Sequence, residues 1–270
     1  MLSNQSRVLT YLMALLYTIL GGLLFFMPGA MAPVFAWKVT PFMTMTIGGW
    51  CFGNAWLGWV VAQRWQWSLV QPSIIYLWLF GLGESIVVLL FRGKLSLTHP
   101  IAWLYVLTLL ANILAAGVGL FDLVRIKPAI ESSSKRVNGV QIAGLVVFTA
   151  FVGFLGLYGS FIKNGSVGTN GGIFPEIMST FTLRSFGVFY LSLSLAVVSL
   201  FWNRNLQTQL SHGFASYGLI VFITAAAFAH IKLFDFVARP GGLLYFAAYL
   251  GVGMFFLVSF IKYGVGVSGT

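Results

Sequence analysis

The chain has few charged residues, and acidic residues are especially scarce. Of its 270 residues, 7% are Asp, Glu, Lys or Arg, and only five are acidic. This is too little charge to coat a soluble globule, while 59% of the residues are hydrophobic and the mean hydropathy is +0.94. The composition therefore predicts an integral membrane protein, in which lipid is the solvent for most outward-facing side chains.

Cysteine is nearly absent too. Cys51 is the single cysteine, so the chain has no intramolecular disulfide and no cysteine-based metal site. Walker, GxSxG and HExxH motifs are also missing. We therefore expect no metal and assign no catalytic residue. Enzymatic activity stays open, although the sequence favours a non-enzymatic role.

Long apolar runs occupy most of the sequence. They are continuously apolar and do not alternate, which favours helices over the strands of a membrane barrel. We predict an all-α, polytopic helical bundle with about eight transmembrane helices, because each run is close to the length of about 20 residues that a span needs. The runs are Leu9–Phe26, Phe42–Gln63, Ser73–Phe91, Pro100–Val124, Val140–Ile162, Phe181–Trp202, Ser211–Phe234 and Gly242–Ile261.

A polar segment divides these runs into two groups of four. We predict a first four-helix half at 1–126, a basic polar linker at 127–139 and a second half at 140–270. Some residues recur between the halves, which either reflects an internal repeat or is a chance feature of apolar sequence. A true repeat of four spans would be parallel. The recurring pairs are Phe42 with Phe181 and Gly48 with Gly187 at a shift of 139, and Pro100 with Pro240 and Tyr105 with Tyr245 at a shift of 140.

The fifteen basic residues lie singly or in pairs between the apolar runs, so the net charge of +10 does not indicate nucleic acid binding. We expect membrane lipid as a partner, together with other membrane subunits. The positive-inside rule favours a bacterial inner membrane location with both termini cytoplasmic. In an eight-span arrangement the side of the termini carries Arg7, Arg64, Arg125, Lys127, Lys135, Arg136, Arg204 and Lys262, and the other side carries Lys38, Arg92, Lys94, Lys163, Arg184, Lys232 and Arg239.

Glu84 is the one acidic residue well inside a run, about 10 Å from the expected helix end at helical rise. An ionised carboxylate at that depth is costly, so the group is expected to be protonated, paired or facing water. Two interpretations follow: a functional site that binds a proton or a ligand, or a structural hydrogen bond to a neighbouring helix or subunit.

Charged side chains near two span ends form a second candidate. Arg184 is in the first turn of one predicted helix, and Asp235 follows the end of the next, on the same membrane face. We predict a structural ion pair between them, for which Lys232 competes because it lies three residues before Asp235.

A cofactor cannot be assigned from the sequence. His230 is the weak candidate for haem or pigment binding, with His99 expected on the same side and His212 at the opposite end of its helix. Asn54 and Asn112, inside two runs, are expected to form interhelical hydrogen bonds.

Three functions remain as hypotheses. The first is a non-enzymatic subunit of a membrane complex, or a scaffold that contacts lipid or pigment. The second is a small secondary transporter with a proton- or ligand-binding Glu84. The third is a membrane enzyme acting on lipid or quinone, which rests on His230, Asp235 and Arg184 near one interface.

Overall fold

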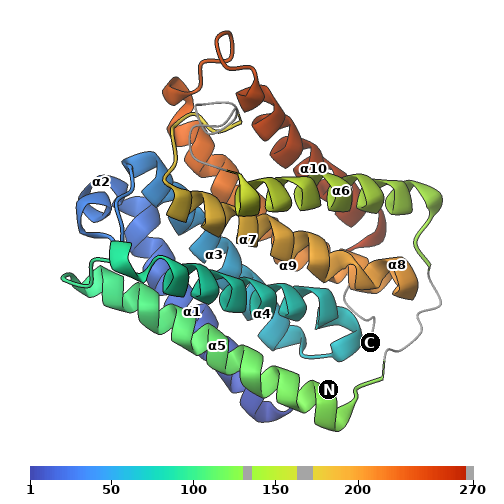
Figure 1. Ribbon diagram of the computed structural model, residues 1–270. Helices are drawn as coiled ribbons and strands as arrows, with labels where there is room; N and C mark the ends of the chain where they lie inside the picture. The colour runs from blue at the N-terminus through green and yellow to red at the C-terminus, as the bar shows by residue number, and fades with distance from the viewer. Residues whose placement is uncertain (130–135, 163–172, 266–270) are drawn as a thin grey trace.

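The computed structural model describes residues 1–129, 136–162 and 173–265, and these residues fold into helices and loops without a strand. Eight of the helices are long, as the sequence predicts for a polytopic bundle (Figure 1). Short helices and 3-10 turns lie between them at Pro28–Met31 (α2), Ala32–Val34 (η1), Arg92–Lys94 (η2), Ser199–Asn203 (α8) and Ile231–Leu233 (η3). The long helices are α1 Asn4–Phe26, α3 Pro41–Arg64, α4 Trp67–Leu90, α5 Pro100–Ile126, α6 Gly139–Phe161, α7 Thr180–Val197, α9 Leu206–Ala229 and α10 Gly241–Tyr263.

Within the described residues, seven helices are long and apolar enough to cross a membrane, with α7 and α8 counted as one helix. The exception among the eight is α3, which is 24 residues long but contains Thr, Gly, Asn and Gln side chains that lower its hydropathy. Most of its residues are buried within the protein. The prediction of about eight spans therefore matches eight long helices, of which the central one is polar enough to fail the test of composition.

Side chains at the helix starts explain where several helices begin. Ser3, Thr40 and Ser179 each precede a long helix and accept a hydrogen bond from a backbone N–H of its first turn. Asn138 forms a reciprocal capping box with Gln141 at the start of α6. These caps satisfy donors that the helix itself leaves free, so the chain can enter each helix at a defined residue.

Proline gave one wrong boundary. The sequence places Pro72 before the third span, which we predicted to begin at Ser73, but α4 begins at Trp67 and Pro72 lies inside it. Near a helix start a missing N–H costs little, because the first turn lacks intrahelical acceptors. Pro100 does open α5, as predicted.

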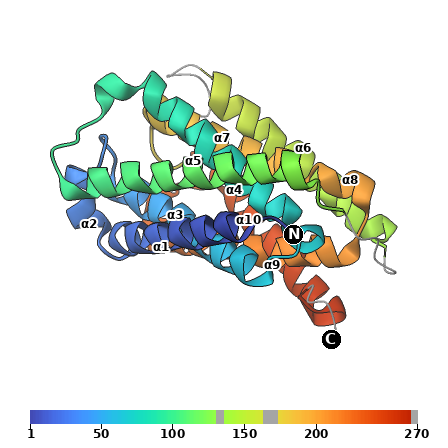
Figure 2. The ribbon, with the colours of Figure 1, turned by 90° about the horizontal axis from the view of Figure 1, so that it is seen from below.

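The helices pack in pairs, and several of these pairs join the first four long helices to the last four. α3 packs closely against α1 on one side and against α9 on the other. α4 packs on α5 and on α7, and α6 packs along α7. Figures 1 and 2 show the blue to green helices on one side of the molecule and the yellow to red helices on the other. The centre is therefore built from both groups.

Both termini lie at the same end of the bundle in Figure 1. We call the opposite end the distal face, and it carries the connections after α1, α4 and α9, at 27–40, 91–99 and 230–240. Part of the predicted linker, at 130–135, and part of the long polar loop after α6, at 163–172, lie outside the described residues.

The two groups of helices have matching boundaries. α6 begins and ends 135 residues after α1, and α9 begins and ends 139 residues after α4. α7 with α8 likewise begins and ends 139 residues after α3. The order of the long helices and the hand-over points between them thus recur along the chain.

Glycines at the tightest helix crossings follow the same offsets. A Cβ on Gly48 of α3 would collide with the backbone of Leu24 and Phe25 in α1. A Cβ on Gly187 of α7 would collide with Ser160 in α6, which is 135 positions after Phe25. Both crossings need the small residue because the two backbones approach closely, as in other tightly packed membrane helices.

Candidate functional site

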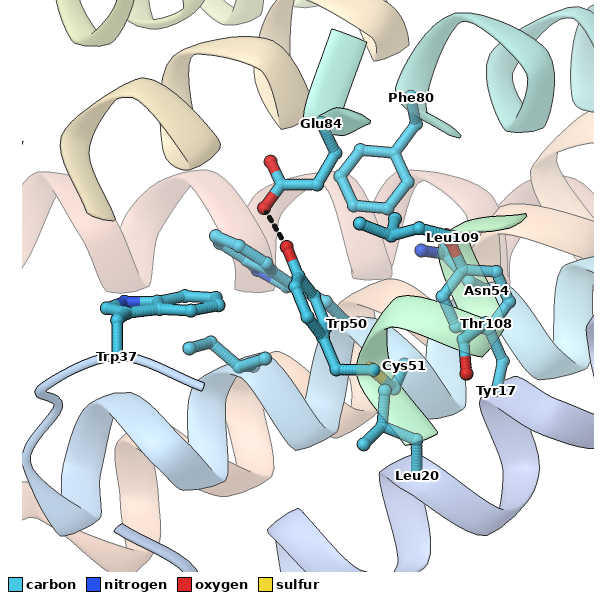
Figure 3. A pocket seen from close by; sticks show the side chains of 12 residues that line it. Tyr17, Leu20, Trp37, Trp50, Cys51, Asn54, Phe80, Glu84, Thr108 and Leu109 are labelled. Carbon is cyan, nitrogen blue, oxygen red and sulfur yellow. Dashed lines mark hydrogen bonds between the residues drawn. The ribbon is translucent and has the colours of Figure 1, made fainter. Parts of the chain in front are cut away.

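Glu84 is buried in the interior, with 3% of its surface exposed, six residues before the distal end of α4. Its Oε1 accepts a hydrogen bond from the Tyr105 hydroxyl of α5 at 2.8 Å and another from Ser185 Oγ of α7 at 2.9 Å. Figure 3 shows the carboxyl group pointing toward the tyrosine hydroxyl. In the described part of the chain, Glu84 Oε2 has no hydrogen-bond partner. The acid is thus held by both halves through one oxygen, and its other oxygen is left for a proton or a further ligand.

A small cavity of about 20 Å³ lies beside Glu84. Its walls come from α1, α3, α4, α5 and the segment before α3, and they are mainly aromatic and aliphatic (Figure 3). This volume is enough for a water molecule but too small for an organic substrate. The lining residues are Tyr17, Leu20, Trp37, Ile47, Trp50, Cys51, Asn54, Phe80, Glu84, Tyr105, Thr108 and Leu109.

Two lining side chains besides Glu84 carry buried polar atoms without a partner among the described residues. These atoms are Trp50 Nε1 and Asn54 Nδ2, and both are hydrogen-bond donors. A buried donor without a partner costs about 1–3 kcal/mol, so such atoms cluster where a site has another state or another occupant. N–H donors repel a metal ion, whereas water or another hydrogen-bond acceptor suits them.

The sequence around Glu84 explains how neighbouring helices approach it. Gly81 lies against the Asn112 side chain of α5, and Gly83 lies against Val188 of α7, so a Cβ at either glycine would overlap its neighbour. Ser85 turns its hydroxyl back onto the carbonyl of Gly81 at 2.6 Å. The segment Gly-Leu-Gly-Glu-Ser therefore brings α5 and α7 close enough for Tyr105 and Ser185 to reach the carboxyl group.

The two intramembrane asparagines form the interhelical hydrogen bonds that the sequence predicts. Asn54 Oδ1 in α3 accepts from the Tyr76 hydroxyl in α4 at 2.8 Å. Asn112 Nδ2 in α5 donates to the Tyr17 hydroxyl in α1 at 2.9 Å. Both pairs are buried next to the cavity, so polar groups from all four helices of the first half gather around Glu84.

The predicted ion pair between Arg184 and Asp235 is not formed. Within the described residues, Arg184 Nη1 donates to the carbonyl of Gly159 in α6 at 2.8 Å. Asp235 Oδ1 accepts from the backbone N–H groups of Val237 and Ala238. The physical reason is that α9 ends at Ala229, so Asp235 lies in an exposed loop and caps a turn there. Lys232 is exposed in the same connection.

The three histidines lie in different surroundings. His230 caps the end of α9, where its ring is 5.5 Å from that of Phe42, and His99 is exposed before α5. His212 is buried, and its Nδ1 is 2.9 Å from Ser73 Oγ. Among the described residues no three His, Cys, Asp or Glu side chains form a metal-binding group. Haem or pigment binding at His230 stays a prediction.

Sequence reasoning did not find the partners of Glu84. Tyr105 had appeared only as part of a recurring pair with Tyr245, and Ser185 carried no signal because hydroxyl side chains are common in apolar helices. The missing information is that α4 packs against α7. No protein family model, no curated protein and no solved structure matches this chain.

Proposed function

We propose that this protein is a small secondary transporter in which Glu84 binds and releases a proton. The observation that carries the proposal is the position of the carboxyl group, which is buried mid-bundle and hydrogen-bonded to both groups of helices through Tyr105 and Ser185. Ionisable residues within a membrane are expensive and are typical of proton and ion pathways. A movement of one half against the other would change this contact and thereby the cost of ionising Glu84.

We further propose that the two halves, 1–126 and 140–270, are an internal repeat joined by the linker at 127–139. The equal offsets of the helix boundaries and of the glycine crossings support this. So does the cross-pairing, in which α3 packs on α9 and α4 packs on α7. Parallel repeats related by an axis along the membrane normal place transport sites at the repeat interface, and Glu84 lies at that interface.

The second position of the proposed repeat shows which half holds the site. The residue 139 positions after Glu84 is Ile223, and the residue 140 positions after Tyr105 is Tyr245. Tyr245 keeps its hydroxyl, which is buried without a hydrogen-bond partner among the described residues. The second half thus retains the tyrosine and lacks the acid, so we assign one proton-binding carboxyl to each chain.

A non-enzymatic membrane subunit is the second candidate, and the outer surface of the second half favours it. In the spanning windows of α6 and α10, 28% and 22% of the residues are buried, against 61% for α7 with α8. Exposed apolar side chains on α10 include Leu250, Met254, Leu257 and Ile261. Lipid or another membrane subunit would cover this surface.

We also propose that the protein belongs to the bacterial inner membrane with both termini in the cytoplasm. The common end of the two termini and the basic residues of that end support this orientation. Anionic lipid headgroups are the natural contacts of those basic side chains.

Reconstituted vesicles that enclose a pH-sensitive dye test the transporter proposal. Sodium, potassium, ammonium, small organic acids and small amines are added outside one at a time, and a proton-coupled carrier changes the internal pH with at least one of them. We expect Glu84→Gln to abolish that response and Asp235→Asn, an exposed loop change, to preserve it. An unchanged response in Glu84→Gln overturns the role of Glu84. A protein that behaves like empty vesicles with every probe, and that is isolated from native membranes with a second subunit, overturns the transporter in favour of the scaffold.

A further inference from the structure

A row of hydroxyl side chains on α7 leads from the distal face to Glu84. Ser179, Thr182 and Ser185 follow one another at intervals of three residues, which places them on one side of the helix. Ser179 is exposed at the start of the helix, Thr182 is 3% exposed and Ser185 is 1% exposed. The row therefore begins in contact with the surroundings of the protein and ends in its interior.

Two of the three steps along this row are hydrogen bonds. Ser179 Oγ and Thr182 Oγ1 are 3.0 Å apart, and Ser185 Oγ donates to Glu84 Oε1 at 2.9 Å. The step between Thr182 and Ser185 is one helical turn, about 5–6 Å between Cβ atoms, and rotation of the two side chains shortens the distance between the hydroxyls. Thr182 Oγ1 is held in place by the indole N–H of Trp37, which donates to it at 3.2 Å.

The other surroundings of Glu84 offer fewer routes to the distal face. The cavity beside it is walled by Trp37, Trp50 and Phe80. The titratable groups that interact with Glu84 are Tyr17, Cys51 and Tyr105, from α1, α3 and α5. These groups are neutral at ordinary pH, so none of them supplies a charge that would fix Glu84 in its ionised form.

The equivalent row in the first half is interrupted. With the offset of 139 residues, Ser179, Thr182 and Ser185 correspond to Thr40, Met43 and Thr46 of α3. Met43 breaks the row of hydroxyls, and Thr46 donates to the carbonyl of Phe42 in its own helix. α3 packs on α9, where the counterpart of Glu84 is Ile223, whereas α7 packs on α4. The complete row and the acid therefore occur together, and both are lost together at the equivalent crossing.

We propose that Ser185, Thr182 and Ser179 conduct protons between Glu84 and the distal face. This inference rests on the proposed proton binding by Glu84. At each transfer a hydroxyl oxygen accepts a proton and passes its own proton to the next oxygen. One proton moves in total, no bond between heavy atoms changes, and rotation of the hydroxyls resets the row. The direction is set by which side has the higher proton concentration.

Hydrogen–deuterium exchange of the Glu84 carboxyl group tests the route. The C=O stretching band of the protonated acid is identified by infrared difference spectroscopy against Glu84→Gln, and its shift is followed after the full-length protein in lipid is moved into D₂O. We expect Thr182→Val and Ser185→Ala to slow the exchange by on the order of tenfold, the rate change that corresponds to losing one hydrogen-bonded step.

Controls separate this inference from the function on which it rests. Ser194→Ala removes another buried hydroxyl of α7, one that donates to the carbonyl of Thr149 in α6, and should exchange at the rate of the parent protein. Thr182→Ser should restore fast exchange if Thr182→Val has not merely disturbed folding. Unchanged exchange in both Thr182→Val and Ser185→Ala overturns the route while leaving proton binding intact. If no protonated band disappears in Glu84→Gln at any pH at which the protein is folded, proton binding itself is overturned.

Discussion

Ser73 Oγ of α4 and His212 Nδ1 of α9 lie 2.9 Å apart in the interior, and the two residues are 139 positions apart in the sequence. Trp50 and Phe189, separated by the same 139 positions, stack with ring centroids 4.8 Å apart. In a molecule built of two related halves, a residue meets its own counterpart only beside the axis that relates them. These two contacts are the expected signature of such an axis through the bundle.

The contact between Ser73 and His212 should be measurable as an energetic coupling. A double-mutant cycle of Ser73→Ala and His212→Ala should give a coupling of about 1 kcal/mol in the free energy of unfolding, because the hydrogen bond is buried. Unfolding in detergent micelles, followed by circular dichroism, provides the measurement. The matched cycle of Ser73→Ala with His230→Ala should be additive, since His230 contacts Phe42 at the distal end instead. Additivity in both cycles would contradict the observed pair.

The glycines at the two tight crossings should be equally intolerant of a methyl group. Gly48→Ala and Gly187→Ala each place a Cβ against the backbone of the neighbouring helix, so each should destabilise the fold by about 1–3 kcal/mol. Gly117→Ala is the control, because nothing lies within 4 Å of the added Cβ. It should raise stability by up to about 1 kcal/mol through helix propensity. Thermal unfolding of the three variants side by side would expose a difference, and a stable Gly48→Ala protein would argue against the close crossing.

The two equivalent tyrosines should respond differently to loss of their hydroxyl groups. Tyr105→Phe removes a hydrogen bond to Glu84 and should lower the free energy of unfolding by about 1–2 kcal/mol. Tyr245→Phe removes a buried hydroxyl that has no partner in the described part of the chain, so it should be neutral or stabilising. Equal destabilisation of both variants, measured by chemical unfolding, would show that the second tyrosine has a partner of its own.

Arg184 and Asp235 should show no coupling. Each has its own partner, with Arg184 on the carbonyl of Gly159 and Asp235 on the backbone of the loop. A cycle of Arg184→Met and Asp235→Asn should therefore be additive within about 0.5 kcal/mol. A larger coupling, read from the shift in thermal midpoint, would restore the ion pair that the sequence suggests.

Much of the architecture is readable from the sequence because lipid demands long apolar helices. The eight runs located all eight long helices, and the recurring Gly48 and Gly187 marked equivalent crossings. Errors arose at the helix ends, where apolar side chains continue past the last hydrogen-bonded turn. The run to Phe234 passes the end of α9 at Ala229, and that error of five residues produced the wrong ion pair.

The site was only half readable. A carboxyl group within an apolar run is conspicuous, so Glu84 could be identified from its surroundings in the sequence. Its partners depend on which helices meet, and apolar helices of similar length and composition give little indication of their neighbours. His212 was assigned by elimination to the far end of its helix, yet its burial and its bond to Ser73 depend on the crossing of α4 with α9.

The hydrogen bond from Ser185 to Glu84 also has a consequence for biosynthesis. The two residues are 101 positions apart, so α4 and α5 are complete well before α7 has been made. During that interval Glu84 has Tyr105 as its neighbour but lacks the second donor that it has in the finished protein. A nascent chain halted between α5 and α7 therefore holds an incompletely bonded acid in the membrane, which makes it a natural substrate for insertion chaperones and quality-control proteases.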